Sequence, residues 1–110
     1  MKPEYVLVES LEKDTLVVSG DLVARFNDQF KSELASFLKP KDVLELSLLH
    51  VESMDVTAIQ LVYTFEGLVR KMNKKLQIVP PSDIQLVSLL ERTGFFSMFK
   101  TLGGSSNDSL

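Results

Sequence analysis

The sequence predicts a single α/β domain built on a mixed sheet of four to five strands, with helices packed mainly on one face. The first observation is the order of hydrophobic patterns, which runs strand, strand, helix, strand, helix, strand, helix. The second is that a short polar turn separates the first two strands, whereas helices separate the later ones, as in a hairpin followed by parallel crossovers. The third is size, because 110 residues without cysteine suit one core that needs neither disulfide nor metal.

Two β-rich segments near the N-terminus predict a hairpin. They span Tyr5–Val8 and Leu16–Val18. The Lys13-Asp14 pair between them suits a turn. Gly20 follows the second segment and allows a sharp change of chain direction there.

An amphipathic helix and a buried strand come next. Apolar residues at helical spacing predict a helix over Asn27–Lys39, and Pro40 cannot continue it. These apolar residues are Phe30, Leu34, Phe37 and Leu38. Val43–Leu49 indicates a buried strand. Its first five residues are apolar on both faces and flanked by helices, so we expect a central strand with parallel neighbours. A loop over His50–Met54 is expected to follow.

The longest helical pattern runs from Thr57 to about Asn73. Its apolar stripe consists of Ala58, Leu61, Val62, Phe65, Leu68, Val69 and Met72. Polar residues fill the remaining positions, so the helix is expected to pack one face on the sheet.

The C-terminal third predicts one more strand and one more helix. Leu76–Val79 indicates the strand, which Pro80 stops. Ser82 with Gln85 has the spacing of a capping box, so the helix is expected to begin there and to end before Gly94.

The last apolar cluster, residues 95–99, indicates a turn followed by a short edge strand. Residues 103–110 are rich in Gly, Ser, Asn and Asp and are expected to form a disordered tail. The predicted domain is therefore residues 1–102.

Composition and charge exclude several classes of function. A net charge of −3 with interspersed signs provides no electrostatic footprint for nucleic acid. The absence of cysteine favours the cytoplasm. Apolar runs are too short for a signal sequence or a bilayer span, so we expect no direct membrane insertion. His50, the only histidine, has no partner at a useful spacing, and no acid–base pair, activated nucleophile or glycine-rich phosphate loop is visible. We expect no catalytic residues, no metal and no cofactor.

Asp55 and Thr57 place a carboxylate and a hydroxyl where a strand leads into a helix. A helix start has unpaired N–H groups and the positive end of the macrodipole, so it tolerates a phosphate on Thr57. A structural interpretation is also available, because Thr57 with Gln60 has capping-box spacing and Asp55 is a suitable capping acid. The residues alone leave both interpretations open.

Four segments, in this order, resemble the STAS domain family, which includes the bacterial anti-sigma-factor antagonists. They are Ser19–Leu22, Val43–Ser47, Met54–Ile59 and Leu90–Phe96. The second is similar to the family strand that ends in an acidic-Leu-Ser step, and the third to the Asp-Ser-Ser-Gly-Leu helix start. The fourth is similar to the closing helix and Gly-Leu/Phe turn. The resemblance covers about Tyr5–Phe99 and implies a STAS-like single-domain fold.

In antagonists of this family, the second hydroxyl residue of that helix start is phosphorylated by a partner kinase that is itself the anti-sigma factor. The resemblance therefore implies that Thr57 is the phosphoacceptor, with Asp55 as the preceding acidic residue. The chain departs from the family pattern at Val56, Ala58 and Gln60. Ala58 and Gln60 are larger than the family's residues at these positions, so they leave less space for a kinase loop to reach Thr57.

The function implied by the resemblance is regulation of a sigma factor by partner switching, with an anti-sigma serine/threonine kinase and a phosphatase as protein partners. The implied partner-binding residues are Gly20, Asp21, Leu22, Asp55, Val56, Thr57, Ala58 and Gln60. We expect Asp21 and Ala58 to lie at strand-to-helix junctions outside the core, so that Asp21→Lys or Ala58→Trp weakens binding and preserves the fold. The alternative is a non-switching structural subunit of a phospholipid-transport ABC complex. A weak homodimer also remains open.

Overall fold

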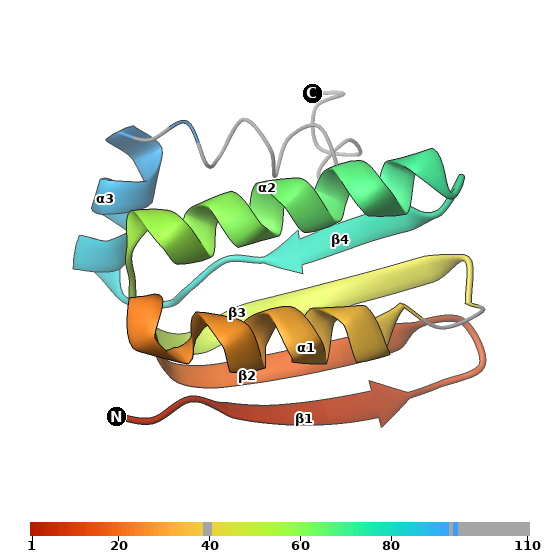
Figure 1. The fold of residues 1–110 in the computed structure, drawn as a ribbon, viewed down its shortest axis with the longest axis horizontal. Coiled ribbons are helices and arrows are strands. Elements are labelled where there is room, and N and C mark those ends of the chain that lie inside the picture. The colour runs from red at the N-terminus through yellow and green to blue at the C-terminus, as the bar shows by residue number, and fades with distance from the viewer. Residues whose placement is uncertain (39–40, 93, 95–110) are drawn as a thin grey trace.

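The described part of the chain, residues 1–38, 41–92 and 94 of a computed structural model, contains one sheet of four strands. The strands are β1 (Glu4–Glu9), β2 (Asp14–Leu22), β3 (Val43–Met54) and β4 (Lys75–Val79), in this spatial order (Figure 1). β1 is antiparallel to β2, whereas β2, β3 and β4 are parallel. The predicted mixed sheet is confirmed, and β3 lies between two parallel neighbours as expected.

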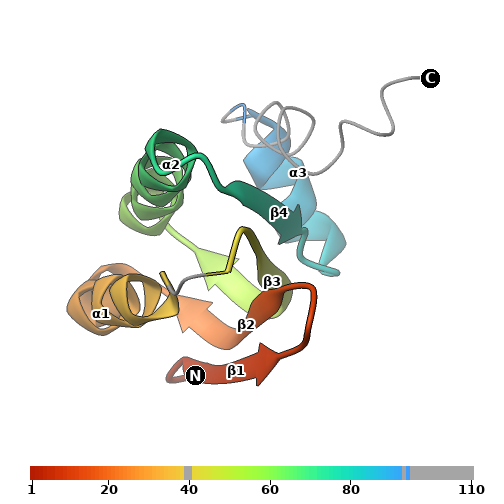
Figure 2. The same cartoon turned by 90° about the vertical axis from the view of Figure 1, so that its right-hand side faces the viewer.

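Helices α1 (Asn27–Phe37) and α2 (Val56–Lys71) cover one face of the sheet, and α3 (Ile84–Arg92) lies on the other side of β4 from α2 (Figure 2). A short 3-10 turn, η1 (Ala24–Phe26), leads from β2 into α1. The prediction of helices mainly on one face is confirmed.

The core lies between the sheet and the helix pair α1 and α2. Every second residue of β2 is buried, which puts Leu16 and Val18 on the helix side. The strand β3 and the two helices add Leu44, Leu46, Leu48, Phe30, Leu34, Phe37, Ala58, Val62, Phe65 and Val69. The rings of Phe37 and Phe65 stack with centroids 5.8 Å apart, which joins α1 to α2.

Strand β3 runs further than predicted. It continues through His50–Met54, so the prediction of a loop there is wrong. This segment pairs in parallel with the end of β2, up to Leu22 opposite Met54. Its polar side chains concealed the strand, because the backbone hydrogen bonds to a neighbour need no apolar pattern.

Gly20 lies inside β2, not at a change of chain direction as predicted. The pairing of β2 with β3 shifts register between Val17 and Ser19 and again between Gly20 and Asp21, as in β-bulges. The φ of Gly20 is +89°, and a Cβ at this position would lie 2.8 Å from the carbonyl oxygen of Lys2. Both the conformation and this close approach require glycine.

Gly20→Ala should therefore lower the free energy of unfolding by about 1–3 kcal/mol, from strain at positive φ and from the clash with the N-terminal segment. Gly67→Ala is the matched control. Gly67 lies within α2, and a Cβ there meets no atom within 4 Å. Gly67→Ala should raise the free energy of unfolding by about 0.5–1 kcal/mol. Urea unfolding measures both, and equal effects of the two substitutions would contradict this account.

Helices α1 and α2 each end two residues before the predicted position, at Phe37 and Lys71. Asn73 follows α2 with a left-handed φ of +60°. The N–H groups of Asn73 and Lys74 donate to carbonyls of the last helical turn. Asparagine thus ends α2 in the way that glycine usually does.

The buried face of α2 is rotated from the predicted stripe. Ile59 and Glu66 are buried, whereas Leu68 and Met72 are 45% and 46% exposed. Since α2 contacts β4 as well as α1, these neighbours decide which of its residues are covered.

Asp83, not Ser82, caps α3. The Asp83 Oδ1 accepts hydrogen bonds from the N–H groups of Gln85 at 2.8 Å and Leu86 at 3.1 Å. The Ser82 hydroxyl donates instead to the carbonyl of Leu49 at 3.1 Å. The predicted capping box is wrong because the hydroxyl is used to hold the connection from β4 against β3.

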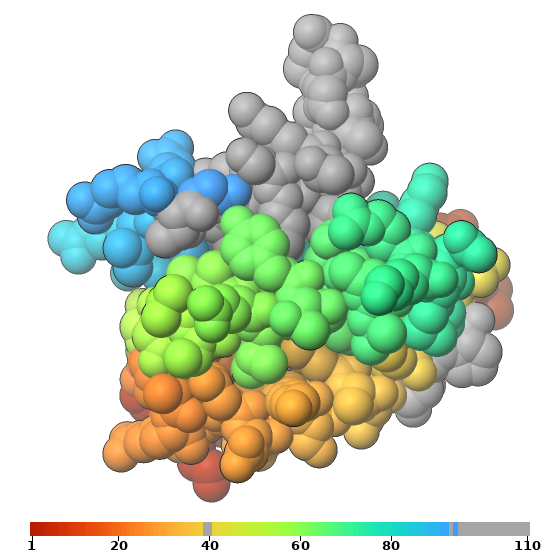
Figure 3. Space-filling model, turned by 45° about the horizontal axis from the view of Figure 1, so that its top comes forward, coloured from red at the N-terminus to blue at the C-terminus, as the bar shows by residue number. Residues whose placement is uncertain are grey.

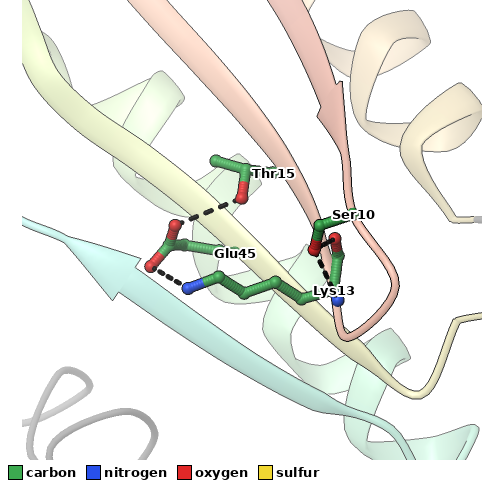
Figure 4. A network of polar contacts seen from close by, with 4 residues as sticks. All are labelled: Ser10, Lys13, Thr15 and Glu45. Atoms are coloured by element: carbon green, nitrogen blue, oxygen red, sulfur yellow. Dashed lines mark hydrogen bonds and ion pairs between the residues drawn. The ribbon is translucent and has the colours of Figure 1, made fainter.

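A polar network closes the hairpin at the amino end of β3 (Figure 4). The Ser10 hydroxyl donates to the carbonyl of Lys13 at 2.7 Å. Glu45 accepts hydrogen bonds from the Lys13 ammonium at 3.1 Å and from the Thr15 hydroxyl at 3.2 Å. The predicted hairpin is confirmed, but its turn spans Ser10–Lys13, and Asp14 already pairs with Glu9 in the sheet. These contacts lie at the opposite end of β3 from Asp55.

Two predictions lie outside the described residues. They are the short edge strand over residues 95–99 and the disordered tail over residues 103–110.

Candidate functional site

The carboxyl ends of the parallel strands meet at one end of the molecule, and α1 and α2 both begin there (Figure 1). In open α/β sheets this is the end where ligands usually bind. In the space-filling view the first turn of α2 lies against the beginning of α1 (Figure 3). The predicted site residues at the end of β2 and after β3 are thus brought together.

Asp55 caps α2. Its backbone is extended, and its Oδ1 accepts a hydrogen bond from the N–H of Ala58 at 3.1 Å. The same oxygen also accepts a hydrogen bond from the Thr57 hydroxyl, with 2.5 Å between the two oxygens. The capping interpretation of Asp55 is confirmed, whereas the Thr57–Gln60 capping box is wrong because Thr57 lies within the first turn and donates to the cap.

The second carboxylate oxygen of Asp55 binds a different helical segment. Its Oδ2 accepts the N–H of Ala24, the first residue of η1, at 2.7 Å. Val23 occupies the cap position of η1 and provides no side-chain hydrogen bond. The sequence contains no signal for this contact, because the donor is a backbone group and the two residues are far apart along the chain.

The pKa of Asp55 is lower than its ordinary value. Burial acts in the opposite direction and would raise it, but hydrogen bonds from the Thr57 hydroxyl and from the N–H groups of Ala58, Ala24 and Thr57 together outweigh burial. At neutral pH the carboxylate is ionised and is a weak base.

Asp21 lies on the same end of the sheet. It pairs with the α-amino group of Met1, and its Oδ1 accepts the hydroxyl hydrogen of Ser53 at 2.9 Å. The hydrogen bond from the α-amino group, followed by that from Ser53, lowers the pKa of Asp21. Asp21 and Asp55 are therefore both anionic beside the start of α2.

The predicted partner-binding residues differ in exposure. Val56 is 62% exposed, Gln60 is exposed, and Asp21, Asp55 and Thr57 are partly exposed. This subset forms a surface that a partner can reach. We call Asp21, Asp55, Val56, Thr57 and Gln60 the helix-start surface.

Three of the predicted residues are buried and lie beneath the helix-start surface. Leu22 is 1% exposed, Ala58 is 0% exposed, and Gly20 is buried. The expectation that Ala58 lies outside the core is wrong, because the first turn of α2 already packs on the sheet. These residues shape the surface from below.

Other chemistries find no support within the described ranges. No group of three or more His, Asp or Glu side chains in residues 1–38, 41–92 and 94 is placed to hold a metal ion. In the same part of the chain, no helix is long and apolar enough to span a bilayer. His50 is exposed and lies opposite Ser19 in the sheet rather than in a loop.

The stability of the protein should depend on pH through Asp55. Since its folded pKa lies below the ordinary 3.8, its stabilising contribution is complete above that value. The contribution is lost as the pH falls through the folded pKa. Urea unfolding from about pH 7 to about pH 3 should show the difference between wild type and Asp55→Asn narrowing below about pH 4. A difference that stays constant over this range would contradict the prediction.

The family model described as Mlab, STAS domain, matches residues 6–99. No curated protein matches the sequence. Among solved structures, an anti-sigma factor antagonist from Mycobacterium paratuberculosis superposes with a TM-score of 0.78 at 13% identity, covering 89% of this chain and 83% of that one.

Two further structures have the same fold. The Bacillus cell fate determinant SpoIIAA in the phosphorylated form has a TM-score of 0.66 at 14% identity, covering 90% of this chain and 87% of that one. A sulfate transporter family protein from Wolinella succinogenes has a TM-score of 0.67 at 21% identity, covering 84% of this chain and 75% of that one.

Proposed function

This chain belongs to the STAS domain family, and from that premise we propose that it is a protein-binding regulator of the anti-sigma-factor-antagonist type. In this proposal the unphosphorylated protein docks on an anti-sigma factor that is a serine/threonine kinase. The kinase phosphorylates Thr57 and the complex dissociates. A phosphatase restores binding. The protein itself is not an enzyme and acts in the cytoplasm.

The observation that carries the proposal is the setting of the Thr57 hydroxyl. The hydroxyl is partly exposed in the first turn of α2. It donates a hydrogen bond to the Asp55 Oδ1, and the two oxygens lie 2.5 Å apart. Its oxygen therefore keeps its lone pairs for the phosphorus of a bound nucleoside triphosphate. Because Asp55 is a weak base, its role toward the hydroxyl is orientation. The positive end of the α2 macrodipole then stabilises the new phosphate.

The docking role is supported by the composition of the helix-start surface. Val56 is an apolar residue that is 62% exposed, and it lies between the charged and polar groups of Asp55 and Thr57. Apolar centres with polar rims are typical of protein interfaces. The neighbouring turn η1 adds Arg25, whose guanidinium lies 4.9 Å from the ring centre of Phe26.

The test is to incubate the protein with its cognate kinase and ATP and to map the phosphate by mass spectrometry. We expect one phosphate, on Thr57, and none on Thr57→Val. Thr64 is a useful internal control, because its hydroxyl donates to the carbonyl of Gln60 at 3.0 Å and is not near Asp55. Phosphate only on Ser53 or on serines of residues 103–110, or none with an active kinase, would reject the switch.

The second candidate is a non-switching subunit of a transporter, such as a phospholipid-transport ABC complex. It is favoured by the likeness to a sulfate transporter family protein from Wolinella succinogenes, at 21% identity, and to the STAS domain of a SulP transporter from Vibrio cholerae, at 20% identity. In that role the helix-start surface would pack permanently against an ATPase. Co-purification with a permease and an ATPase, together with unchanged binding by Thr57→Asp, would establish this candidate and reject the first.

A further inference from the structure

We infer that Asp55 is a shared cap for two helical segments and that it couples the state of Thr57 to η1, the turn that leads into α1. The inference concerns regulation at the same surface, and its phosphorylation step rests on the proposed function. The coupling itself is a property of the unmodified protein and is tested separately.

The first step of the argument is the division of the carboxylate between two segments. Oδ1 accepts from Ala58 and Thr57 of α2, at 3.1 and 2.5 Å. Oδ2 accepts from Ala24 of η1, at 2.7 Å. Val23 cannot cap η1 by itself, since it has no polar side-chain atom, so the cap comes from across the sheet end. One rigid group thus binds the starts of two helices that follow different strands.

The second step is that Asp55 cannot readily move for one segment without affecting the other. Its N–H donates to the carbonyl of Leu22 at 3.2 Å, and its carbonyl accepts from Ile59 at 3.1 Å. The main chain of Asp55 is therefore fixed between β2 and α2. Adjustment is left to rotation of the carboxylate, which moves both oxygens together.

The third step is the effect of a phosphate. An oxygen pair at 2.5 Å is held together by the hydrogen between them. When Thr57 becomes a phosphate ester, that hydrogen is lost and a group with about −1.5 to −2 charges stands beside an ionised carboxylate. The carboxylate must rotate away from Thr57, and the hydrogen bond to Ala24 is lost. The first residue of η1, which leads into α1, is then released.

The test uses backbone amide resonances and amide hydrogen exchange in the full chain. Thr57→Val removes the hydroxyl hydrogen, whereas Thr57→Ser retains it. Because Thr57→Val removes one of the two donors that orient Oδ1 and leaves the N–H of Ala58, we expect it to shift the Ala24 amide and to speed its exchange by at most about fivefold, the full loss of one cap. Thr57→Ser should leave Ala24 unchanged. An unchanged Ala24 amide in Thr57→Val would overturn the coupling.

Asp55→Asn provides a second, independent readout. An amide side chain has only one acceptor oxygen, whereas a carboxylate has two. Asparagine is as good a cap as aspartate for a single helix. We therefore expect this variant to lose protection at one of the two amides, Ala24 or Ala58, and to keep it at the other. Protection of both amides would overturn the shared cap.

Failure of the inference and failure of the proposed function are distinguishable. If an active kinase does not modify Thr57, the proposed function fails, and the Thr57→Val and Asp55→Asn spectra still decide the coupling. If Thr57 is modified and the Ala24 amide does not change, the coupling is overturned and the switch survives. A shifted Ala24 amide in the phosphorylated protein supports both.

Discussion

Ala58→Trp should leave the protein largely unfolded. Ala58 is 0% exposed in the first turn of α2, where the helix packs on the sheet. Protein interiors have little free volume, so the indole would have to lift α2 away from the strands. Overpacking usually costs about 1–3 kcal/mol, and this exchange, the largest available from alanine, should cost at least about 3 kcal/mol. Circular dichroism and urea unfolding measure the loss.

Val56→Trp is the matched control for this prediction. It places the same indole two residues earlier, at a side chain that is 62% exposed, so stability should change by no more than about 0.5 kcal/mol. If Ala58→Trp unfolded no more readily than Val56→Trp, the packing of the first turn of α2 on the sheet would be wrong. Of the two variants, only Val56→Trp is suited to test partner binding.

Phosphorylation of Thr57 should weaken binding to the partner by about 100-fold or more. The phosphate adds about −1.5 to −2 charges at a point where Asp21 and Asp55 are already ionised. A partner surface that fits the neutral hydroxyl would face several kcal/mol of repulsion and desolvation. Calorimetry of the phosphorylated and unphosphorylated protein with the partner gives both dissociation constants.

The same phosphate should lower the free energy of unfolding by no more than about 1 kcal/mol, because the lost hydrogen bond to Ala24 is a single cap and the N-terminal end of α2 stabilises negative charge. Thr57→Asp should reproduce part of the loss of binding, and Thr57→Val should retain binding. Equal affinity of the phosphorylated and unphosphorylated forms would exclude partner switching. A large fall in stability on phosphorylation would show that the switch acts by unfolding instead of by repulsion.

Strong periodic patterns explain why most elements were predictable. The apolar residues Phe30, Leu34 and Phe37 recur at helical spacing, and each is buried in α1. The segment starting at Val43 has apolar residues on both faces of the strand, so both faces need to be buried. It forms an inner strand with parallel neighbours. In both cases the side chains that signal the element also hold it in the core.

Caps and strand ends were predicted less well. Several hydroxyl and carboxyl groups near a helix start can each accept the first N–H groups, and spacing alone favoured Ser82 and Thr57. The structure uses Asp83 in place of Ser82, and at α2 it uses Asp55, which the sequence had also offered as a capping acid, in place of Thr57. The choice depends on which backbone conformation the preceding strand and connection impose, and that conformation is set by contacts with other strands.

The sequence by itself determined the fold class, the order of the elements and the presence of a carboxylate and a hydroxyl at the start of α2, because these follow from local periodicity and residue type. Tertiary structure decided which of the candidate residues a partner can reach, since burial of Ala58 and Leu22 arises from the packing of α2 and β2. It also decided that Asp55 binds the N–H of Ala24. That contact exists only because parallel pairing brings the ends of β2 and β3 together, and no local pattern records it.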